Sequence, residues 1–488
     1  LLSDTHASIV LINPPITQGQ REGYLGPVIK NLYFNSPPLG LAYIAGNLER
    51  EGIAVQVIDA AVEELTLEQT VERIRALAPS IVGMTSTSNF FVNAVELARR
   101  VKETLPAITT LLGGPHMTSN GDHAMQQKVF DIGCIGEGEI TALEVVRTLA
   151  SGDDLSEVKG IVFRRDEELV STEPRPLVKD LDALPPPARH LLPLSKYVPQ
   201  PNDGPYLPKA AVISSRGCPY PCIFCDHGTF GSTYRSFSAE RIVDEMAELV
   251  DTYGIKDIAF VDSLFMISRE RVSKIIDEIF RRNVKVHWTC TIRANIADEE
   301  ILARMKKAGC WRVRIGVEAG DEDILKLIRK EVSLEQVRRV VSVADKLNLH
   351  PKAFFMVGHI GETAASIEKS IKLAKSLALT DITVQINTPL RGAAQWDMYK
   401  DYGELVTDSL EDFSFWEPVF VPNGMTTAEL ERLHRKFYRA FYFRPIVVWR
   451  HLRMLRKVSD LKRYTRALSL LVGMFVVDRR KHTGSRAS

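Results

Sequence analysis

Two long stretches of the chain alternate short β-rich runs with helical patterns, and this alternation restricts the fold more than any other feature. In the first stretch, helical patterns separate five strand patterns at 7–15, 54–60, 80–89, 109–117 and 131–139. Five strands joined by helices predict an α/β domain over residues 1–150, with a doubly wound, Rossmann-like parallel sheet. Ligands of such sheets bind beyond the carboxyl ends of the strands.

The second stretch repeats the alternation in the middle of the chain. Its strand patterns lie at 209–216, 257–265, 286–294, 311–320, 352–358 and 381–390. Six such units predict a partial (β/α)6 barrel over residues 209–395, because an eight-unit barrel needs more chain. The proline-dense residues 151–208 predict a linker, and residues 396–488 predict a mostly helical C-terminal segment.

Length and charge agree with this division and exclude some functions. The chain has 488 residues, more than one hydrophobic core usually serves. Its net charge of +1 lacks the basic field of nucleic-acid-binding proteins. We see no secretory signal, and the longest apolar run (468–477) is shorter than the roughly 20 residues that span a bilayer. We therefore expect a cytoplasmic location and no nucleic-acid partner.

Three of the six cysteines lie together in the segment "SRGCPYPCIFCDHG" (214–227). Cys218, Cys222 and Cys225 have the spacing C-x3-C-x2-C. Thiolates bind soft metals, so the loop predicts a zinc site or an iron–sulfur site. In the zinc alternative, His227 is the fourth ligand. Three thiolates on a [4Fe–4S] cluster instead leave one iron open to a substrate or cosubstrate.

This loop, placed at the end of the first strand of a six-unit barrel, resembles the signature of the radical S-adenosylmethionine (SAM) enzymes. The preceding α/β region resembles the cobalamin-binding domain of their cobalamin-dependent branch through its "NPP", "PPLG", "GGPH" and "GEGE" turns. Together the two resemblances cover roughly residues 8–390. They imply three cofactors: a [4Fe–4S] cluster, SAM and cobalamin.

The resemblance to radical SAM enzymes implies roles for individual residues. Cys218, Cys222 and Cys225 would ligate three irons, and the amino and carboxylate groups of SAM would chelate the fourth. The implied SAM-binding residues are Phe224, Asp262, Ser263, Arg314, Glu318 and Gln385, with the turn 358–363 beside the ribose and adenine. Asn387 lies on the same side of its strand as Gln385. A single polar residue within a strand is also commonly structural, so that alternative stays open for these last two.

Small and hydroxyl residues collect at the predicted strand ends of the N-terminal domain. The expected cobalamin contacts are Pro14, Ser86, Thr87, Ser88, Gly113, Gly114, Pro115, His116, Glu137 and Gly138. The alternative is that these are merely tight strand–helix turns, with His116 a packed turn residue. The chain has "NPPITQGQ" where other cobalamin domains carry Asp-x-His-x-x-Gly, so no histidine is expected below the cobalt.

The combined resemblance favours a methyltransferase acting on an unactivated carbon through a 5′-deoxyadenosyl radical and methylcobalamin. An oxidative cyclase of the anaerobic porphyrin cyclase type is the alternative enzyme. A cobalamin-binding sensor or carrier without catalysis is the alternative from another class. The methylthiotransferases of tRNA hold a second cluster with three N-terminal cysteines. Cys134 is the single cysteine of residues 1–150, so we set this alternative aside.

The expected partners are a small molecule and an electron donor such as flavodoxin or ferredoxin. The C-terminal residues 449–482 mix arginine and lysine with leucine and valine at helical spacing. Such a helix lies on an anionic membrane or packs on the barrel with a solvated basic side. Membrane contact at the inner face would suit an apolar substrate, such as a lipid or tetrapyrrole.

Overall fold

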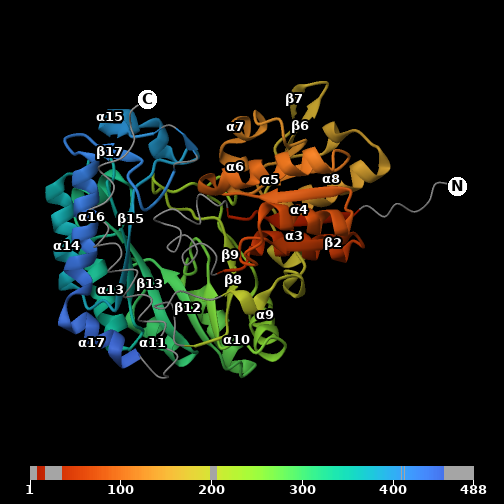
Figure 1. The fold of residues 1–488 in the computed structure, drawn as a ribbon. Helices are drawn as coiled ribbons and strands as arrows, with labels where there is room; N and C mark the ends of the chain where they lie inside the picture. The colour runs from red at the N-terminus through yellow and green to blue at the C-terminus, as the bar shows by residue number, and fades with distance from the viewer. Residues whose placement is uncertain (1–7, 17–35, 198–205, 408, 411–412, 455–488) are drawn as a thin grey trace.

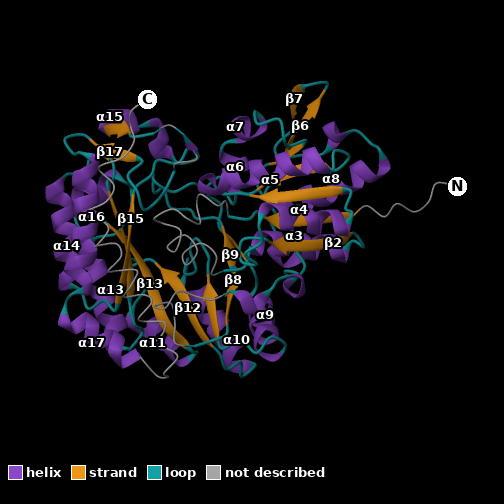
Figure 2. Cartoon of the chain, in the orientation of Figure 1, coloured by secondary structure: helices purple, strands orange, loops and turns teal. Residues whose placement is uncertain are grey.

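Two sheets organise the molecule, which is described by a computed structural model (Figure 1). The structure describes residues 8–16, 36–197, 206–407, 409–410 and 413–454. The first sheet lies in the N-terminal region and the second in the middle of the chain, and helices flank both (Figure 2).

The N-terminal sheet has the strand order β2-β1-β3-β4-β5-β6-β7. Its first five strands are parallel: β1 (Ser8–Asn13), β2 (Ala54–Asp59), β3 (Ile81–Thr85), β4 (Thr109–Gly113) and β5 (Ile132–Cys134). Ile9 and Leu11 of β1 pack on one core, whereas Val10 and Ile12 pack on the other. The predicted doubly wound sheet is thus confirmed, and its strand order reverses between β1 and β3.

Each face of this sheet carries a pair of helices. One pair is α3 (Leu39–Arg50) with α8 (Gly138–Ser151), and the other is α4 (Leu67–Leu77) with α5 (Phe91–Thr104). The short helices α6 (Pro115–Ser119) and α7 (Gly121–Met125) follow β4. A capping box between Thr66 and Gln69 starts α4, which satisfies backbone groups that the first helical turn leaves free.

The sheet continues beyond residue 150, into the segment that the sequence predicts as a linker. Strands β6 (Ile161–Arg165) and β7 (Glu168–Ser171) add to it as an antiparallel hairpin. Ile161 and Phe163 enter the core, while most of β7 is exposed. The hairpin is short and its outer strand β7 has only four residues, so its sequence pattern is weak.

The second sheet contains all six predicted strands, in sequence order and parallel. They are β8 (Lys209–Val212), β11 (Asp257–Phe260), β12 (His287–Ile292), β13 (Cys310–Glu318), β14 (Lys352–Val357) and β15 (Asp381–Ile386). The connecting helices are α9 (Ala239–Asp251), α10 (Arg269–Arg281), α11 (Glu299–Lys307), α12 (Glu322–Leu327), α13 (Leu334–Lys346) and α14 (Ala364–Ser376). The partial barrel is therefore confirmed, and the Ser238 side chain caps the first turn of α9.

The partial barrel has an outer, helix-covered face and an inner face. Val313 and Val317 of β13 pack in the core beneath the helices. Because side chains alternate along a strand, Arg314 and Glu318 point to the inner face. Separately, β9 (Ser215–Arg216) and β10 (Arg235–Ser236) form a two-stranded sheet just after β8.

The C-terminal part closes the open edge of the barrel. The Tyr438 hydroxyl of α16 (Thr427–Tyr442) accepts a hydrogen bond from Val384 N (2.9 Å) and donates one to Val384 O (3.0 Å). It thereby occupies backbone groups of the edge strand β15. This part also contains α15 (Tyr399–Tyr402) and α17 (Pro445–Met454), and it differs from the predicted helical segment by a hairpin of β16 (Gly403–Leu405) and β17 (Phe420–Pro422).

Most of the predicted basic helix lies outside the described residues, because the description ends at Met454. Among the helices that are described, none has the length and apolar character needed to cross a bilayer.

Candidate functional site

The cysteine loop begins directly after β9, at Gly217. The backbone there has φ = 78°, which only glycine adopts without strain. A Cβ at this position would lie 2.2 Å from the carbonyl oxygen of Thr233. Cys222 is buried, Cys218 is half-buried and Cys225 is exposed. The three thiols therefore lie on one loop at the carboxyl end of the first barrel strand.

We predict that Gly217→Ala lowers the iron content of anaerobically reconstituted protein. The left-handed backbone costs a non-glycine residue about 1–2 kcal/mol, and the added methyl group would displace Thr233 or the loop. Gly254→Ala is the matched control, since Gly254 has φ = 65° but open space around it. Equal iron content in the two variants would contradict the prediction.

The loop rests on the carboxyl ends of the barrel strands. Ile223 N donates to Ile328 O (3.2 Å), and Gln395 N donates to Ile223 O (2.9 Å). The buried Arg293 lies just past β12, with Nη1 3.8 Å from Cys222 Sγ and its guanidinium 3.4 Å from the Tyr220 ring centre. The guanidinium would offset part of the negative charge that metal-bound thiolates bring to the loop.

Two of the predicted SAM-binding residues, Phe224 and Glu318, meet around Lys330. Lys330 Nζ lies 5.9 Å from the centre of the Phe224 ring and 2.6 Å from Glu318 Oε1. Glu318 ends β13 with φ = 68°, a conformation uncommon outside glycine. The His359 ring lies 5.6 Å from Phe224, centre to centre. The aromatic residue of the loop thus faces the ends of β13 and β14.

Several buried polar atoms beside the loop have no hydrogen-bond partner among the described residues. They are both ring nitrogens of His359, Glu362 Oε1 and Gln395 Oε1. Buried polar atoms are nearly always paired in folded proteins. These donors and acceptors therefore suit a polar ligand seated against the loop, and the residues present fit the SAM that the sequence predicts.

Burial raises the pKa of Glu362 to about 8, although the backbone N–H groups of His359 and Gly358 oppose the shift. The folded protein then holds a proton that the unfolded chain releases, so wild-type stability falls as pH rises from about 5 to 8. Glu362→Gln should remove this slope, which is at most about 1.4 kcal/mol per pH unit. Urea unfolding of the apoprotein across that range measures it. Parallel stability curves for the two proteins would contradict the prediction.

The other predicted SAM contacts lie in varied settings. Arg314 and Gln385 are half-buried on the inner face, and Ser263 is exposed. Asp262 is buried, and its Oδ1 accepts from Ser214 N and Ser215 N, both at 2.6 Å. Its Oδ2 accepts from Ser214 Oγ (2.8 Å). Both carboxylate oxygens are thus occupied in holding the chain that leads into the cysteine loop.

Asn387 also has structural partners. Its Nδ2 donates to Gly358 O (3.2 Å) and its Oδ1 accepts from Gln395 Nε2 (3.1 Å). The structural alternative therefore describes Asn387, which ties the turn 358–363 to the segment beneath Ile223.

The predicted cobalamin turns gather at the carboxyl edge of the N-terminal sheet, on either side of the point where its strand order reverses. Pro14 and Ser86 are buried, whereas Thr87 and Pro115 are exposed. A Cβ at Gly113 would find only the Cys134 Cβ, at 3.9 Å. The glycine therefore leaves space at the end of β4. Gly114 is required for a different reason. Its φ is 92°, and a Cβ there would lie 2.6 Å from Thr85 Oγ1.

His116 lies in the domain interior. It is fully buried, stacks on Phe91 at 3.9 Å between ring centres, and places Nδ1 3.1 Å from Ser88 Oγ. Burial lowers its pKa to about 3, so the ring is neutral. This placement fits the alternative that His116 is a packed turn residue. The Ser88 hydroxyl is hydrogen-bonded to the same ring, so it also has a structural partner.

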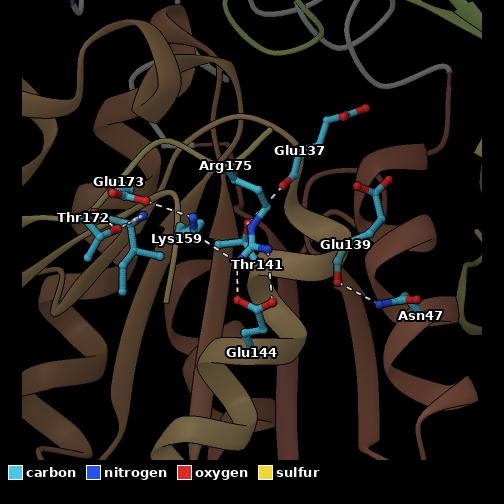
Figure 3. Close-up of polar contacts among 10 residues, drawn as sticks. Asn47, Glu137, Glu139, Thr141, Glu144, Lys159, Thr172, Glu173 and Arg175 are labelled. Atoms are coloured by element: carbon cyan, nitrogen blue, oxygen red, sulfur yellow. Dashed lines mark hydrogen bonds and ion pairs between the residues drawn. The ribbon is translucent and has the colours of Figure 1, made fainter. Parts of the chain in front are cut away.

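Glu137 does not offer a free side chain to a ligand. Its carboxylate is buried against Arg216 and Arg235, at 2.7 and 2.8 Å. Figure 3 shows Glu137 and Glu139 at the start of α8, with carboxylates directed away from the Arg175–Glu144 pair farther along the helix. Gly138 serves packing, because a Cβ there would lie 2.7 Å from Ile44 Cδ1 of α3.

The zinc alternative gains no support from the geometry. Within the part of the chain that the structure describes, no three or more His, Cys, Asp or Glu side chains are grouped closely enough to hold one metal ion. A single zinc ion draws its ligands to within bonding distance of one point.

Sequence reasoning missed the cations around the loop. Arg293 and Arg216 fall at the carboxyl ends of the strand patterns 286–294 and 209–216, and that position was a usable signal. Lys330 and Arg235 carried no comparable signal, since each acts through partners distant in sequence.

Comparisons with known proteins match both halves of the chain. The model of the B12 binding domain matches residues 26–146, and the model of the Radical SAM superfamily matches residues 212–374. An uncharacterized methyltransferase of Pyrococcus horikoshii is 33% identical over 84% of this chain and 89% of its own.

Two further similarities concern an enzyme and a solved structure. The anaerobic magnesium-protoporphyrin IX monomethyl ester cyclase of Rubrivivax gelatinosus is 29% identical over 84% of this chain and 74% of its own. The radical SAM methyltransferase TsrM of Kitasatospora setae, solved with cobalamin and a [4Fe–4S] cluster, superposes with a TM-score of 0.67. The superposition covers 87% of this chain and 84% of the TsrM chain. The sequence identity is 18%, so this likeness concerns the fold alone.

Proposed function

Because the chain belongs to the cobalamin-dependent radical SAM enzymes, with a [4Fe–4S] cluster, SAM and cobalamin as cofactors, we propose that it is a C-methyltransferase. The observation that carries the proposal is the 33% identity to an uncharacterized methyltransferase over most of both chains. The methyl acceptor would be an unactivated carbon, since the 5′-deoxyadenosyl radical that the cluster and SAM supply can abstract hydrogen from such a carbon.

The chain's own residues would bind and orient these groups. Cys218, Cys222 and Cys225 would hold the cluster, with Arg293 Nη1 3.8 Å from the Cys222 sulfur. SAM would lie against Phe224 and the ends of β13 and β14, where His359 and Glu362 leave buried polar atoms unpaired in the described structure. Lys330 would face both the ligand and Glu318.

Cobalamin would lie at the carboxyl ends of β1, β3, β4 and β5. Contacts between the domains support this placement. Ser119 Oγ of α6 donates to Asp226 Oδ2 (2.6 Å), one residue past Cys225, and Glu137 reaches Arg216, two residues before Cys218. The carboxyl edge of the N-terminal sheet is therefore in direct contact with the cysteine loop. Of the predicted contacts, Pro14, Ser86, Thr87, Gly113, Gly114 and Pro115 stay in this proposal, through backbone or side chain.

An oxidative cyclase is the second candidate, and the 29% identity to a porphyrin ester cyclase favours it. Methylation adds one carbon to the product, whereas cyclisation adds none. A sensor or carrier without catalysis would need no cluster, and iron and sulfide analysis distinguishes it.

Anaerobic incubation with SAM, hydroxocobalamin and a reductant tests the assignment by mass spectrometry. A methyltransferase of this kind consumes SAM in two ways, so S-adenosylhomocysteine and 5′-deoxyadenosine should both form. Formation of 5′-deoxyadenosine alone would favour the cyclase.

For the remaining partners we propose an external electron donor of the flavodoxin or ferredoxin type and a small apolar substrate.

We also propose a cytoplasmic protein that contacts the inner face of the membrane through its C-terminal segment. Ile446, Val448, Trp449 and Leu452 of α17 are exposed, which supports a surface for lipid. Equal liposome flotation of the full chain and a chain ending at Pro445 would remove the membrane proposal.

A further inference from the structure

A buried ion-pair network joins the N-terminal domain to the strand that leads into the cysteine loop. Arg216 Nη1 lies 2.7 Å from Glu137 Oε1, and Arg216 Nη2 lies 2.5 Å from Glu139 Oε1. Arg235 Nη1 lies 2.8 Å from Glu137 Oε2. The four side chains are 7% exposed or less. Two carboxylates thus face two guanidinium groups in an interior that excludes water.

Glu137 is the shared member of the network. Its Oε1 accepts from both arginines, and its Oε2 accepts from Arg235 and from Val178 N (2.8 Å). The Arg216 guanidinium also lies 5.2 Å from the ring centres of Tyr43 and Phe230. One carboxylate at the start of α8 therefore fixes two strands of the barrel domain, β9 and β10.

The other end of the cysteine loop has its own anchor in the N-terminal domain. Ser119 Oγ donates to Asp226 Oδ2 (2.6 Å), and a Cβ at Gly228 would lie 2.9 Å from Ser119 Oγ. The loop is therefore held at both ends by the turns that follow β4 and β5, the same turns that carry predicted cobalamin contacts.

Stability alone gives little reason for such a network. A buried ion pair is commonly no more stabilising than well-packed apolar residues, because both charges lose their hydration. What charged hydrogen bonds from one guanidinium to two carboxylates supply is a defined geometry. The network fixes where the cysteine loop lies relative to the N-terminal turns.

We propose that Glu137 is a positioning residue that couples cobalamin binding to SAM binding. A ligand at the carboxyl ends of β4 and β5 restrains the backbone of the turn that carries Glu137, without contacting the Glu137 side chain. Glu137 then transmits the restraint through Arg216 to the cysteine loop two residues on. By linkage, each ligand then tightens the binding of the other by the same factor. The inference rests on the proposed placement of the two cofactors, and it adds a residue that does not itself touch either reacting group.

The test uses the full chain with its cluster reconstituted anaerobically. The SAM dissociation constant is measured with and without hydroxocobalamin for wild type, Glu137→Gln and Glu144→Gln. Glu144 is the matched control, because it lies on the same helix as Glu139 and pairs with Arg175 of the N-terminal region (Figure 3). We expect hydroxocobalamin to tighten SAM binding about tenfold in wild type and Glu144→Gln, a usual size for coupling between sites, and less than about twofold in Glu137→Gln.

The electron paramagnetic resonance spectrum of the reduced cluster provides a second readout. Under excess reductant, and after subtraction of the cob(II)alamin signal, added cobalamin should alter the cluster's part of the SAM-dependent spectrum in wild type and Glu144→Gln. It should leave that part unchanged in Glu137→Gln. Full coupling in folded, iron-loaded Glu137→Gln would overturn the proposal. A wild-type protein in which hydroxocobalamin does not change SAM binding would overturn it as well.

If Glu137→Gln does not fold, Arg216→Lys decides, since a lysine keeps the positive charge but cannot contact Glu137 and Glu139 together as the Arg216 guanidinium does. It should reduce the coupling, and undiminished coupling in Arg216→Lys would overturn the proposal. All these readouts measure binding, so they remain informative if the reaction proves not to be methylation.

Discussion

Replacing Cys222 with alanine should abolish both the iron–sulfur chromophore and the formation of 5′-deoxyadenosine and S-adenosylhomocysteine. Cys222 is the buried thiol of the loop and the one nearest Arg293. Two thiolates cannot hold a cubane firmly, and without the cluster no electron reaches SAM. We expect both products to fall to the level of a sample without enzyme, as measured by mass spectrometry.

Cys310→Ala is the control for this variant. Cys310 is buried beneath the barrel helices, where a thiol acts as a small apolar group. Its removal should leave iron content and both products close to wild type. Persistent 5′-deoxyadenosine in Cys222→Ala would exclude the loop as the cluster site.

Asp262→Ala should lower the free energy of unfolding by about 3–5 kcal/mol, because each buried donor left without its acceptor costs about 1–3 kcal/mol. The change strands the backbone N–H groups of Ser214 and Ser215. It also removes a carboxyl group whose pKa burial raises above its usual value, although the Arg271 charge opposes that shift. Urea unfolding of the apoprotein measures the loss, and iron content should fall because these serines lead into the loop.

Asp277→Ala is the matched control, since Asp277 pairs with Arg304 but remains largely exposed. Such a surface change should stay within about 0.5 kcal/mol of wild type. Suppose instead that Asp262→Ala unfolds like wild type and loses only SAM affinity. Asp262 would then be the SAM contact that the sequence predicts, and its anchoring role would be wrong.

The sequence predicted the fold well because strand and helix patterns are local. All six barrel strands and the first five strands of the N-terminal sheet could be placed, since each is an apolar run of ordinary length between turn residues. The hairpin of β6 and β7 could not, because its outer strand is short and mostly exposed. Residues 403–405 and 420–422 pair across a gap that no local pattern spans.

The site was predictable only in part, because its geometry depends on distant pairs. The three cysteines share one loop, so their spacing identified them. Glu137 and Arg216 are 79 residues apart, and no pattern indicated that they meet. The sequence therefore suggested a cobalamin contact at Glu137, where the structure places an ion pair. His116 is similar, since the stacking on Phe91 that buries it is a tertiary contact.

Iron and sulfide analysis with Mössbauer spectroscopy, on anaerobically prepared protein before and after SAM addition, tests the central claim most directly. We predict about four irons and four sulfides per chain, with one iron whose spectrum changes when SAM is added. A colourless protein with one zinc ion bound by Cys218, Cys222, Cys225 and His227 would contradict it.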